Sequence, residues 1–407
     1  IDAGPAVGEV RFVFYVALEA GAGSFVVGAL PDGVTATMTD EVVGTAGSVY
    51  LTVTNVSLRS WFGSASGTPN GTWDIATTTN WIDKLTNTAA AYVDGAAVVF
   101  PDLFDPSLYE TDVLLDVTVA PGKVTFDNSS DVYTLSGGGK ISGTASLVKR
   151  GTAPLTVYTL NDYTGATTLE GGTTTINTLA DGGSPSTIGA SSADPGNLVL
   201  RGGLLDYQGP AVSIDRGLTI DATGSGIHAA NDLTLGGPVV TSGGNLTKTG
   251  AGNLTLTNPG ANAMGMVNQG LRVDGGTLTL EGSGTQTNSV GGELWLGSLP
   301  DTPANLVLNN TSLAAAGWLY MGRGNGSTST FTTLAATGSA ITTAGFSTGY
   351  DAGLADNDSD QAISLTDTAW TANGHTLLAE STNATTTLTL AGASVYHANG
   401  RFQAALG

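Results

Sequence analysis

The chain of 407 residues contains no cysteine, so disulfide bonds and thiol chemistry are excluded. Cations are scarce as well: 13 lysines and arginines stand against 34 aspartates and glutamates, which gives a formal net charge of -21. A protein that binds nucleic acid needs a basic surface for the phosphates, so nucleic acid is not expected as a partner. The acidity favours solubility, and it leaves open that some turn carboxylates bind calcium.

Long hydrophobic runs are absent too. No run reaches the ~18 apolar residues of a membrane helix, so this chain is not expected to span a membrane. The sequence begins at Ile1-Asp2 without a methionine or a signal sequence, which indicates a processed mature chain or a fragment. No segment repeats apolar residues with the period that an amphipathic helix requires.

Short alternating runs fill the sequence instead. Segments such as NLTLTN, TLTLEG, NLVLRGG and SVYLTVTNV alternate apolar and polar residues, and Gly, Asn and Asp separate them, which is the pattern of β-strands and turns. Glycine and proline number 59 and 14, well below the roughly 25–30% of a disordered low-complexity chain. The sequence therefore predicts an ordered, all-β protein.

The chain also repeats itself. SLVKRGTAPLTV and NLTKTGAGNLTL align at an offset of 99 residues, and TLEGGTTTI and RVDGGTLTL align at an offset of 104. The first pair matches Leu147, Lys149, Gly151 and Leu155 to Leu246, Lys248, Gly250 and Leu254. Repeats of strand and glycine turn are typical of stacked β architectures, because one unit cannot bury its apolar face alone.

Glycine spacing indicates how the strands stack. Gly297, Gly322 and Gly349 follow one another at intervals of 25 and 27 residues, about one turn of a helix made of three strands. In such a helix each rung lies ~4.8 Å above the last, and glycines such as Gly276 mark corners that need a positive φ. We therefore predict a right-handed parallel β-helix, a β-solenoid of roughly a dozen rungs.

Composition divides the chain into three segments. Residues 1–57 are an N-terminal β segment, which would supply either capping strands or strands for a neighbouring molecule. Residues 58–101 are a tryptophan-rich opening or cap segment, and residues 102–407 carry the β-helix repeats.

Three of the six tryptophans, Trp61, Trp73 and Trp81, lie within 21 residues of the tryptophan-rich segment. Their rings could stack on sugars, since an aromatic face packs well against a pyranose ring. Burial in a cap at one end of the solenoid is favoured, because tryptophan is mostly buried in proteins.

The segment NLTKTGAGNLTLTN, followed by GLRVDGGTLTL, closely resembles the autotransporter-associated β-strand repeat of bacterial secreted and outer-membrane-anchored proteins. The copy at 143–180 keeps a Tyr163-Thr164-Gly165 turn that is typical of the repeat, whereas the copy at 243–282 has ANAMGMVNQG in its place. The resemblance implies an extracellular or bacterial cell-surface location. It also implies a structural role, as a fibre or as the adhesin passenger of an autotransporter.

The stretch DNDSD places Asp356, Asp358 and Asp360 two residues apart, with Asp351 upstream. Alternate carboxylates in a tight loop can surround a hard cation, which makes these four residues a candidate calcium site. The stretch lacks the downstream glutamate and the glycine of an EF-hand loop, and a solvated acidic turn is the simpler explanation. No other cofactor is suggested.

Carbohydrate chemistry is the alternative function, because β-helix proteins include enzymes that cleave polysaccharides. The candidate residues are Asp206, Asp215, Asp221, Asp232, Arg201, Arg216 and Lys248. These acids are dispersed over turns, whereas glycoside hydrolysis needs two carboxyl groups within ~5–10 Å of each other. His228, His375 and His397 share no metal-ligand spacing. No catalytic residue is therefore assigned, and an enzyme is not expected.

Together the patterns predict a non-enzymatic extracellular structural protein, a surface filament or adhesin, with a carbohydrate-binding or polysaccharide-cleaving β-helix as the alternative. A β-helix leaves unpaired N–H and C=O groups at both ends, which must be capped or recruit another strand. The runs EVRFVFYVAL and TLTLAGASVYHANGRFQAALG, near the two termini, could satisfy each other between molecules. The expected partner is a further copy of the chain in head-to-tail order and, in the alternative, surface polysaccharide.

Overall fold

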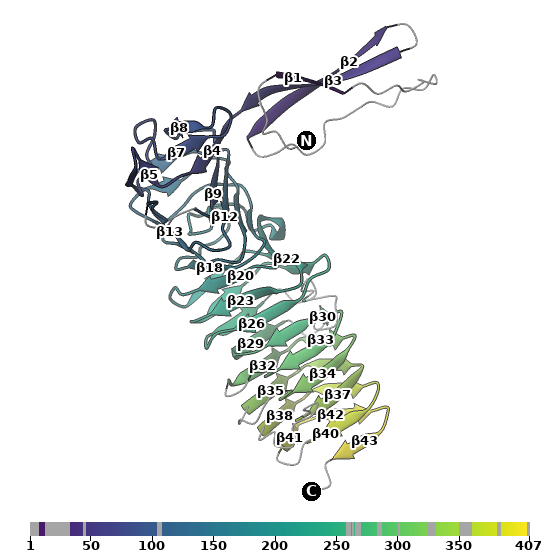
Figure 1. The fold of residues 1–407 in the computed structure, drawn as a ribbon. Coiled ribbons are helices and arrows are strands. Elements are labelled where there is room, and N and C mark those ends of the chain that lie inside the picture. Colours follow the sequence, from purple (N-terminus) through teal and green to yellow (C-terminus); the bar gives the residue numbers. More distant parts are fainter. Residues whose placement is uncertain are drawn as a thin grey trace.

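A computed structural model of the chain describes residues 8–12, 33–43, 46–103, 108–257, 262, 264, 270–282, 287–299, 302–323, 331–349, 360–380 and 384–404. Within these residues the secondary structure consists of strands and one short 3-10 helix, η1 (Pro195–Asn197). The prediction of an all-β protein is confirmed. Most of the strands stack into one long solenoid (Figure 1).

One parallel sheet runs along the solenoid and forms its first face, and each strand pairs with the strand one turn later (Figure 1). In chain order its strands are β10 (Asp112–Leu114), β13 (Tyr133–Ser136), β16 (Leu155–Val157), β18 (Thr173–Ile176), β20 (Leu204–Tyr207), β23 (Ser225–Ala229), β26 (Leu246–Thr249), β28 (Leu271–Val273), β31 (Leu294–Leu296), β34 (Trp318–Met321), β37 (Gly345–Thr348), β40 (Thr376–Leu378) and β43 (Phe402–Ala404).

Two sheets, one after the other, form the second face. The first contains β4 (Leu58–Trp61), β7 (Trp81–Asp83), β8 (Thr88–Ala90), β9 (Ala97–Pro101), β12 (Lys123–Asp127), β15 (Leu147–Arg150), β17 (Thr167–Leu169), β19 (Leu198–Arg201), β22 (Leu218–Ala222) and β25 (Val239–Thr241). The second contains β30 (Thr287–Val290), β33 (Ser312–Ala315), β36 (Ala340–Thr343), β39 (Ala369–Ala372) and β42 (Val395–Ala398). Asn262 bridges them: its side chain accepts from the N–H of Val239 at 3.0 Å, and its carbonyl accepts from the N–H of Ser289 at 2.9 Å.

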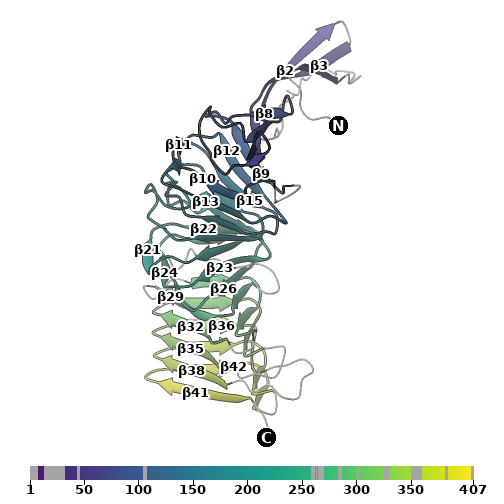
Figure 2. The ribbon, with the colours of Figure 1, turned by 60° about the vertical axis from the view of Figure 1, so that its left-hand side comes forward.

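The third face begins with a short pair and continues as an eight-stranded parallel sheet. The pair is β11 (Thr118–Val119) and β14 (Lys140–Ile141), and the sheet contains β21 (Val212–Ile214), β24 (Leu233–Leu235), β27 (Asn253–Leu256), β29 (Gly276–Glu281), β32 (Ala304–Asn309), β35 (Phe331–Thr337), β38 (Asp360–Thr366) and β41 (Thr385–Ala391). Figure 2 shows these later strands lying one above another. The predicted parallel β-helix is confirmed.

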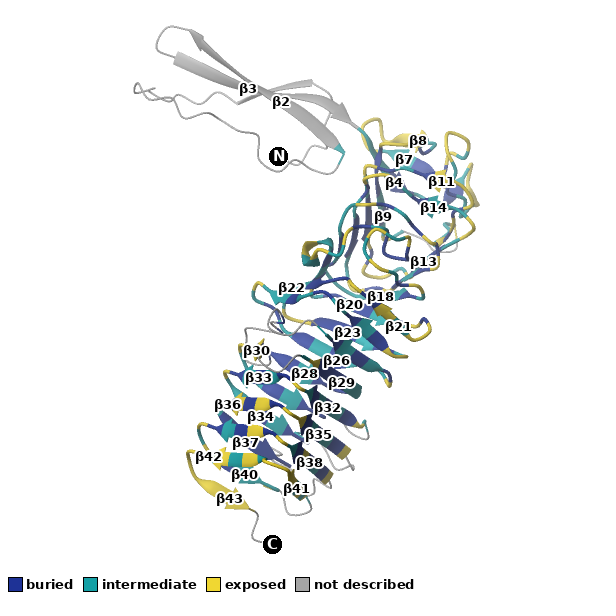
Figure 3. Cartoon of the chain, turned by 180° about the vertical axis from the view of Figure 1, so that it is seen from behind, coloured by how far each residue is buried: buried dark blue, intermediate teal, exposed yellow. Residues whose placement is uncertain are grey.

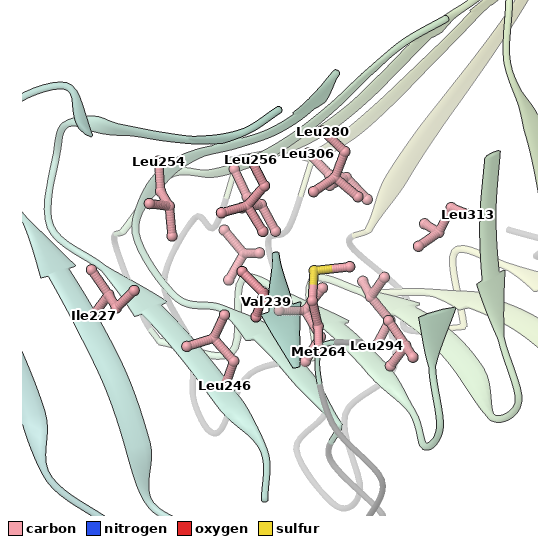
Figure 4. Packing of buried hydrophobic residues seen from close by; sticks show 14 of the residues in the cluster. Ile227, Val239, Leu246, Leu254, Leu256, Met264, Leu280, Leu294, Leu306 and Leu313 are labelled. Carbon is pink, nitrogen blue, oxygen red and sulfur yellow. The ribbon is translucent and has the colours of Figure 1, made fainter. Parts of the chain in front are cut away.

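Leucine side chains from all three faces fill the interior of the solenoid (Figure 4). Along β32 every second residue is buried, which is the alternation that the sequence pattern predicts. The strands stack in register, so Leu278 of β29 pairs with Leu306 of β32, and Leu306 pairs with Leu334 of β35. Because full burial of one leucine stabilises a fold by ~1.5–3 kcal/mol, every rung adds its own share of stability.

The corner between the third and second faces is held by buried polar side chains. Asn262 donates to the side-chain oxygen of Asn288 at 3.0 Å, and Asn288 donates to the hydroxyl of Thr311 at 2.9 Å. The backbone N–H of Thr311 then donates to Ser339 Oγ at 3.3 Å, and that of Ser339 to Thr368 Oγ1 at 3.2 Å. Since a buried polar group costs stability unless it is hydrogen-bonded, this ladder keeps the corner in one conformation.

The N-terminal strands form a separate antiparallel sheet. β3 (Ala46–Val56) lies between β1 (Gly8–Phe12) and β2 (Val34–Val43) and pairs with both of them. The β segment expected at residues 1–57 therefore contains these three strands. A small hairpin of β5 (Ser64–Ala65) and β6 (Thr68–Pro69) follows. β4 pairs in parallel with β9 and antiparallel with β7, so the parallel stack gives way to antiparallel pairing at this end.

Replacement of Gly276 by Ala is expected to lower the free energy of unfolding by about 2 kcal/mol. Gly276 has a φ of 64°, as the sequence predicts for this turn, and an added Cβ would lie 2.3 Å from the carbonyl oxygen of Gly250. Gly183 is the matched control, because its φ is 83° but a Cβ there meets nothing within 4 Å. Urea titrations of both variants measure the difference, and equal losses would show that the close approach to Gly250 costs nothing.

Candidate functional site

The repeated segment lies at a corner of the solenoid, but its two copies lie at different corners. In the first copy, β15 belongs to the second face and β16 to the first face. In the second copy, β26 belongs to the first face and β27 to the third. The same residues therefore form a corner wherever they fall around the solenoid, which shows that the segment encodes a local bend and not a fixed side of the molecule.

A fully buried lysine fixes each of these corners. The amino group of Lys248 donates to the carbonyl oxygens of Thr249 at 2.8 Å, Gly250 at 2.9 Å and Gly275 at 2.9 Å. Lys149 likewise donates to the carbonyl of Gly151 at 3.0 Å and to that of Arg150. In both corners the lysine amino group is therefore bound to main-chain oxygens inside the solenoid. Buried in this way, Lys248 cannot act as a catalytic cation toward a substrate, and its role is structural.

Burial lowers the pKa of both Lys149 and Lys248 from 10.5 to about 8. The unfolded chain then binds more protons than the folded chain above pH 8, so stability should rise with pH by about 2 kcal/mol per lysine between pH 8 and pH 10. Above pH 10 the trend should reverse, because burial raises the pKa of Tyr163 and other core tyrosines. Urea titrations across this range test the prediction, and a flat profile from pH 8 to pH 10 would contradict it.

The four candidate acids do not converge on one cleft. Asp206 lies on the first face and accepts a hydrogen bond from Thr175 at 2.8 Å, whereas Asp221 lies on the second face and pairs with Arg201 at 2.6 Å. Asp215 follows the end of β21, and Asp232 precedes the start of β24. Asp215 accepts a hydrogen bond from the backbone N–H of Gly182, and Asp232 accepts one from that of Asn253. The structure therefore offers these acids as turn and ion-pair residues.

Arg216 and the three histidines lie apart as well. Arg216 is buried and donates to the carbonyl of Ala180 at 2.8 Å, to that of Gly189 at 3.0 Å and to Ser191 Oγ at 3.0 Å, so it ties down the long loop before β19. The three histidines occur on different turns: His228 in β23, His375 before β40 and His397 in β42. The structure does not bring them together.

Trp61, Trp73 and Trp81 lie in the core, where each is at most 1% exposed. They form an edge-to-face cluster, with ring centroids 4.8 Å apart for Trp61 and Trp81 and 5.4 Å apart for Trp73 and Trp81. Phe100 continues the stack against Phe126, 4.4 Å away. The prediction that these tryptophans are buried in the core is confirmed, and their use as sugar platforms is excluded by burial.

Other aromatic rings do reach the surface, on the first face. In β31 and β34 the leucines and Met321 point inward, so Trp295, Trp318 and Tyr320 point outward and are only half-buried. The rings of Trp318 and Tyr320 lie nearly parallel with centroids 5.8 Å apart, and those of Trp295 and Tyr320 are 5.9 Å apart. We call these three residues, with Glu293, Arg323 and Glu380, the aromatic patch.

Charged groups surround the rings of the aromatic patch. The guanidinium of Arg323 lies 4.3 Å from the ring centroids of both Trp295 and Tyr320. Glu293 accepts a hydrogen bond from the indole N–H of Trp295 at 2.9 Å. Burial, followed by the negative charge of Glu293, raises the pKa of the Tyr320 hydroxyl. Two carboxylates, Glu293 and Glu380, therefore act on the phenol of Tyr320 at the surface of the solenoid.

A shallow groove of ≈ 570 Å³ lies at the corner between the second and first faces. It crosses several rungs and is lined by small residues, among them Gly291, Ala316, Ala344 and Gly374. Gly291 lies two residues before Glu293, and Ala316 lies two residues before Trp318. The ring of Trp318 lies against Gly345, the residue after Ala344, so one edge of the groove lies near this ring.

A part of the chain is similar to a bacterial adhesin. Over 117 residues it is 45% identical to the protein named adhesin BmaC autotransporter of Brucella suis biovar 1 (strain 1330). The match covers 28% of this chain and 3% of that protein, so this chain corresponds to a small part of its relative. No known protein family matches the chain, and no solved structure does. The resemblance to an autotransporter repeat is thus supported at the level of an autotransporter adhesin, without a specific repeat family.

The candidate calcium site falls mainly outside the described residues. Asp351, Asp356 and Asp358 lie there, whereas Asp360 is the exposed first residue of β38. Among the residues that the structure describes, no three His, Asp or Glu side chains are grouped as metal ligands. The calcium site stays a prediction. In the same described part of the chain, no helix has the length and hydropathy needed to cross a membrane.

Sequence reasoning missed the aromatic patch. In the sequence, the segments ELWLGS and WLYMGRG served only to predict the length of one solenoid turn from their glycines. Both segments also alternate inward leucines with outward aromatic residues. Reading the two strands in register would have placed Trp295 beside Tyr320, its pairing partner on the next rung. The contributions of Arg323 and Glu380 could not be read in this way, because both lie at corners after the strands.

Proposed function

We propose that the chain is a section of a bacterial surface adhesin, in which the solenoid carries a binding face and catalyses no reaction. The observation that carries this proposal is the match to an autotransporter adhesin at 45% identity, combined with the parallel β-solenoid. Two further features support it. The interior is packed with side chains from all three faces, and the candidate acids Asp206 and Asp221 lie on different faces.

Attachment of protein-coated beads to surfaces tests the proposal. Beads carrying the chain should bind saturably to at least one of a panel of cultured cells and polysaccharide-coated surfaces, and soluble chain should block the binding. Beads coated with an unrelated protein of similar negative charge are the control, because the formal charge of -21 alone affects adsorption. Attachment no greater than that control on every surface would overturn the proposal.

Head-to-tail assembly is the finer part of the proposal. Within the described residues, β41, β42 and β43 each pair with one strand, and Leu390, Val395 and Phe402 on these strands are 48%, 56% and 55% exposed (Figure 3). Exposed apolar residues beside strand edges favour the addition of further strands, from the same chain or from another. We propose that the N-terminal strands of a second copy supply them, which gives a contact that does not close into a ring.

Deletion of residues 1–57 tests this assembly. The intact chain should sediment as concentration-dependent oligomers, whereas the shortened chain should sediment as a monomer with an unchanged β-rich circular dichroism spectrum. If the intact chain stays monomeric at high concentration, the assembly is refuted while the adhesive function stands.

Calcium, where it binds, is expected to act locally. Because solenoid stability is a sum over neighbouring rungs, chelation should speed hydrogen exchange in the segment from Asp351 to Asp360 and leave the leucine-filled rungs protected. Exchange measured by mass spectrometry with calcium and with chelator gives the comparison. Equal protection of this segment in both samples would remove calcium from the cofactors of the protein.

A further inference from the structure

We propose that the aromatic patch binds a neutral hexose oligosaccharide, with the sugar chain lying along the patch and the adjoining groove. The inference rests on the proposed adhesive function and names a ligand class and a site for it. It is carried by surface aromatic rings, by the polar groups between them and by the charge around them.

The rings suit the faces of sugar rings. A pyranose has apolar C–H faces and a polar rim of hydroxyls, and an indole or phenol ring has an apolar face of similar size. The centroids of Trp295 and Tyr320, and those of Trp318 and Tyr320, are separated by 5.9 and 5.8 Å. The ring of Trp295 is inclined by 71° to that of Tyr320, and the guanidinium of Arg323 lies 4.3 Å from the centroids of both rings. A sugar unit can therefore stack on the ring of Trp318, with Arg323, held by the other two rings, beside it.

Gly345 holds the ring of Trp318 flat against the sheet. A Cβ at position 345 would lie 2.5 Å from an atom of that ring, so only glycine leaves room for it. The indole therefore lies over the main chain of the next rung and does not project into solvent. A flat ring presents one broad face outward, which is the geometry that stacking on a sugar needs.

The polar groups of the patch match a rim of hydroxyls. Carboxylates accept hydrogen bonds from hydroxyl groups, and the guanidinium of Arg323 donates several. Glu293 is held by the indole N–H of Trp295, and Glu380 is held by the hydroxyl of Ser347, so both carboxylates are fixed before a ligand arrives. Groups that are already ordered lose less entropy on binding.

Charge selects against acidic sugars. Asp274 pairs with Arg272 at 2.7 Å beside the patch, and together with Glu293, Glu380 and Arg323 these residues carry three negative and two positive charges. The whole chain adds a formal charge of -21. A uronate or sulfated polysaccharide would therefore be repelled at long range, whereas a neutral chain would not.

The groove extends the site beyond the rings. The groove is shallow and open, with a volume of ≈ 570 Å³, so a ligand would lie along it and stay partly in solvent. Glycines and alanines make up much of its lining, and Ser289, Thr342 and Asn373 add hydrogen-bonding groups. An oligosaccharide of several units would fill both surfaces.

Isothermal titration calorimetry with neutral hexasaccharides of glucose, galactose and mannose tests the site. At least one should bind the intact chain, and both Trp295→Ala and Trp318→Ala should weaken that binding about tenfold or more. Phe331→Ala is the matched control: Phe331 is 49% exposed but belongs to the third face, so its loss should leave binding unchanged. Circular dichroism verifies that each variant is folded.

Three results would overturn the inference. None of the neutral hexasaccharides binds, the two tryptophan variants bind as tightly as the intact chain, or hexagalacturonate binds more tightly than its neutral counterpart. If the coated beads attach to a surface while any of these results holds, the adhesive function stands and only this site is wrong. If the beads fail to attach although the sugar binds, the adhesive function is wrong and the site stands.

Discussion

Replacement of Trp61 by Ala is expected to lower the free energy of unfolding of the N-terminal rungs by about 4 kcal/mol. The ring is 1% exposed, lies 4.8 Å from Trp81 and 5.4 Å from Phe100, and donates its indole N–H to the carbonyl of Glu110 at 2.7 Å. Its removal leaves a cavity and an unsatisfied carbonyl at the end of the core. Both costs add, because the surrounding rings cannot collapse far.

Trp295→Ala is the matched control for Trp61→Ala. Trp295 also donates one indole hydrogen bond, to Glu293, but its ring is half-buried on the outer face. We expect it to cost about 1 kcal/mol or less. Urea titration followed by hydrogen exchange measures both variants, and the Trp61 variant should lose protection mainly in the rungs before β16. Equal losses in the two variants would show that the tryptophan cluster does not close the core.

Replacement of Lys248 by Met is expected to lower the free energy of unfolding by about 3 kcal/mol. The methionine keeps the length of the side chain but leaves the carbonyls of Thr249, Gly250 and Gly275 without their buried donor. The variant should also lose about half of the rise in stability between pH 8 and pH 10, since one of the two buried lysines is gone.

Lys84→Met is the control for the buried lysine, because Lys84 is exposed. Its effect should stay within about 0.5 kcal/mol. Urea titrations of the two variants at pH 7 and pH 10 give both comparisons. A Lys248 variant as stable as the Lys84 variant would mean that the corner keeps its geometry without the amino group.

Local features of the sequence predict this fold well. The alternation in segments such as NLTLTN depends only on which side of a strand faces the core, and the structure buries Leu254 and Leu256 as expected. Gly276 has a positive φ and lies close to the carbonyl of Gly250, and each of these favours glycine. The glycine pair before an alternating strand predicts such a turn. Burial of the tryptophan cluster follows from the size and apolarity of the rings.

The face on which a repeat lies could not be predicted in the same way. The two copies are offset by 99 residues, but turns of the solenoid differ in length: β16 and β18 start 18 residues apart, and β18 and β20 start 31 residues apart. Long corner loops absorb the difference, so residue number does not fix the face. The aromatic patch combines residues of β31 and β34 with Glu380, which follows β40. Because the lengths of the intervening turns cannot be read from the sequence, these residues could be brought together only in the structure.

The claim that the solenoid binds surfaces without cleaving them is tested most directly by counting newly formed polysaccharide ends. The chain is incubated for a day with the polysaccharides and cell surfaces to which the coated beads attach, and newly formed reducing ends and unsaturated ends are counted against a heat-denatured control. We expect attachment with no more chain ends than in the control, because Asp206 and Asp221 lie on different faces and Asp215 and Asp232 are bound to backbone N–H groups at turns. Steady release of chain ends in proportion to the protein added would contradict it and would establish the polysaccharide-cleaving alternative.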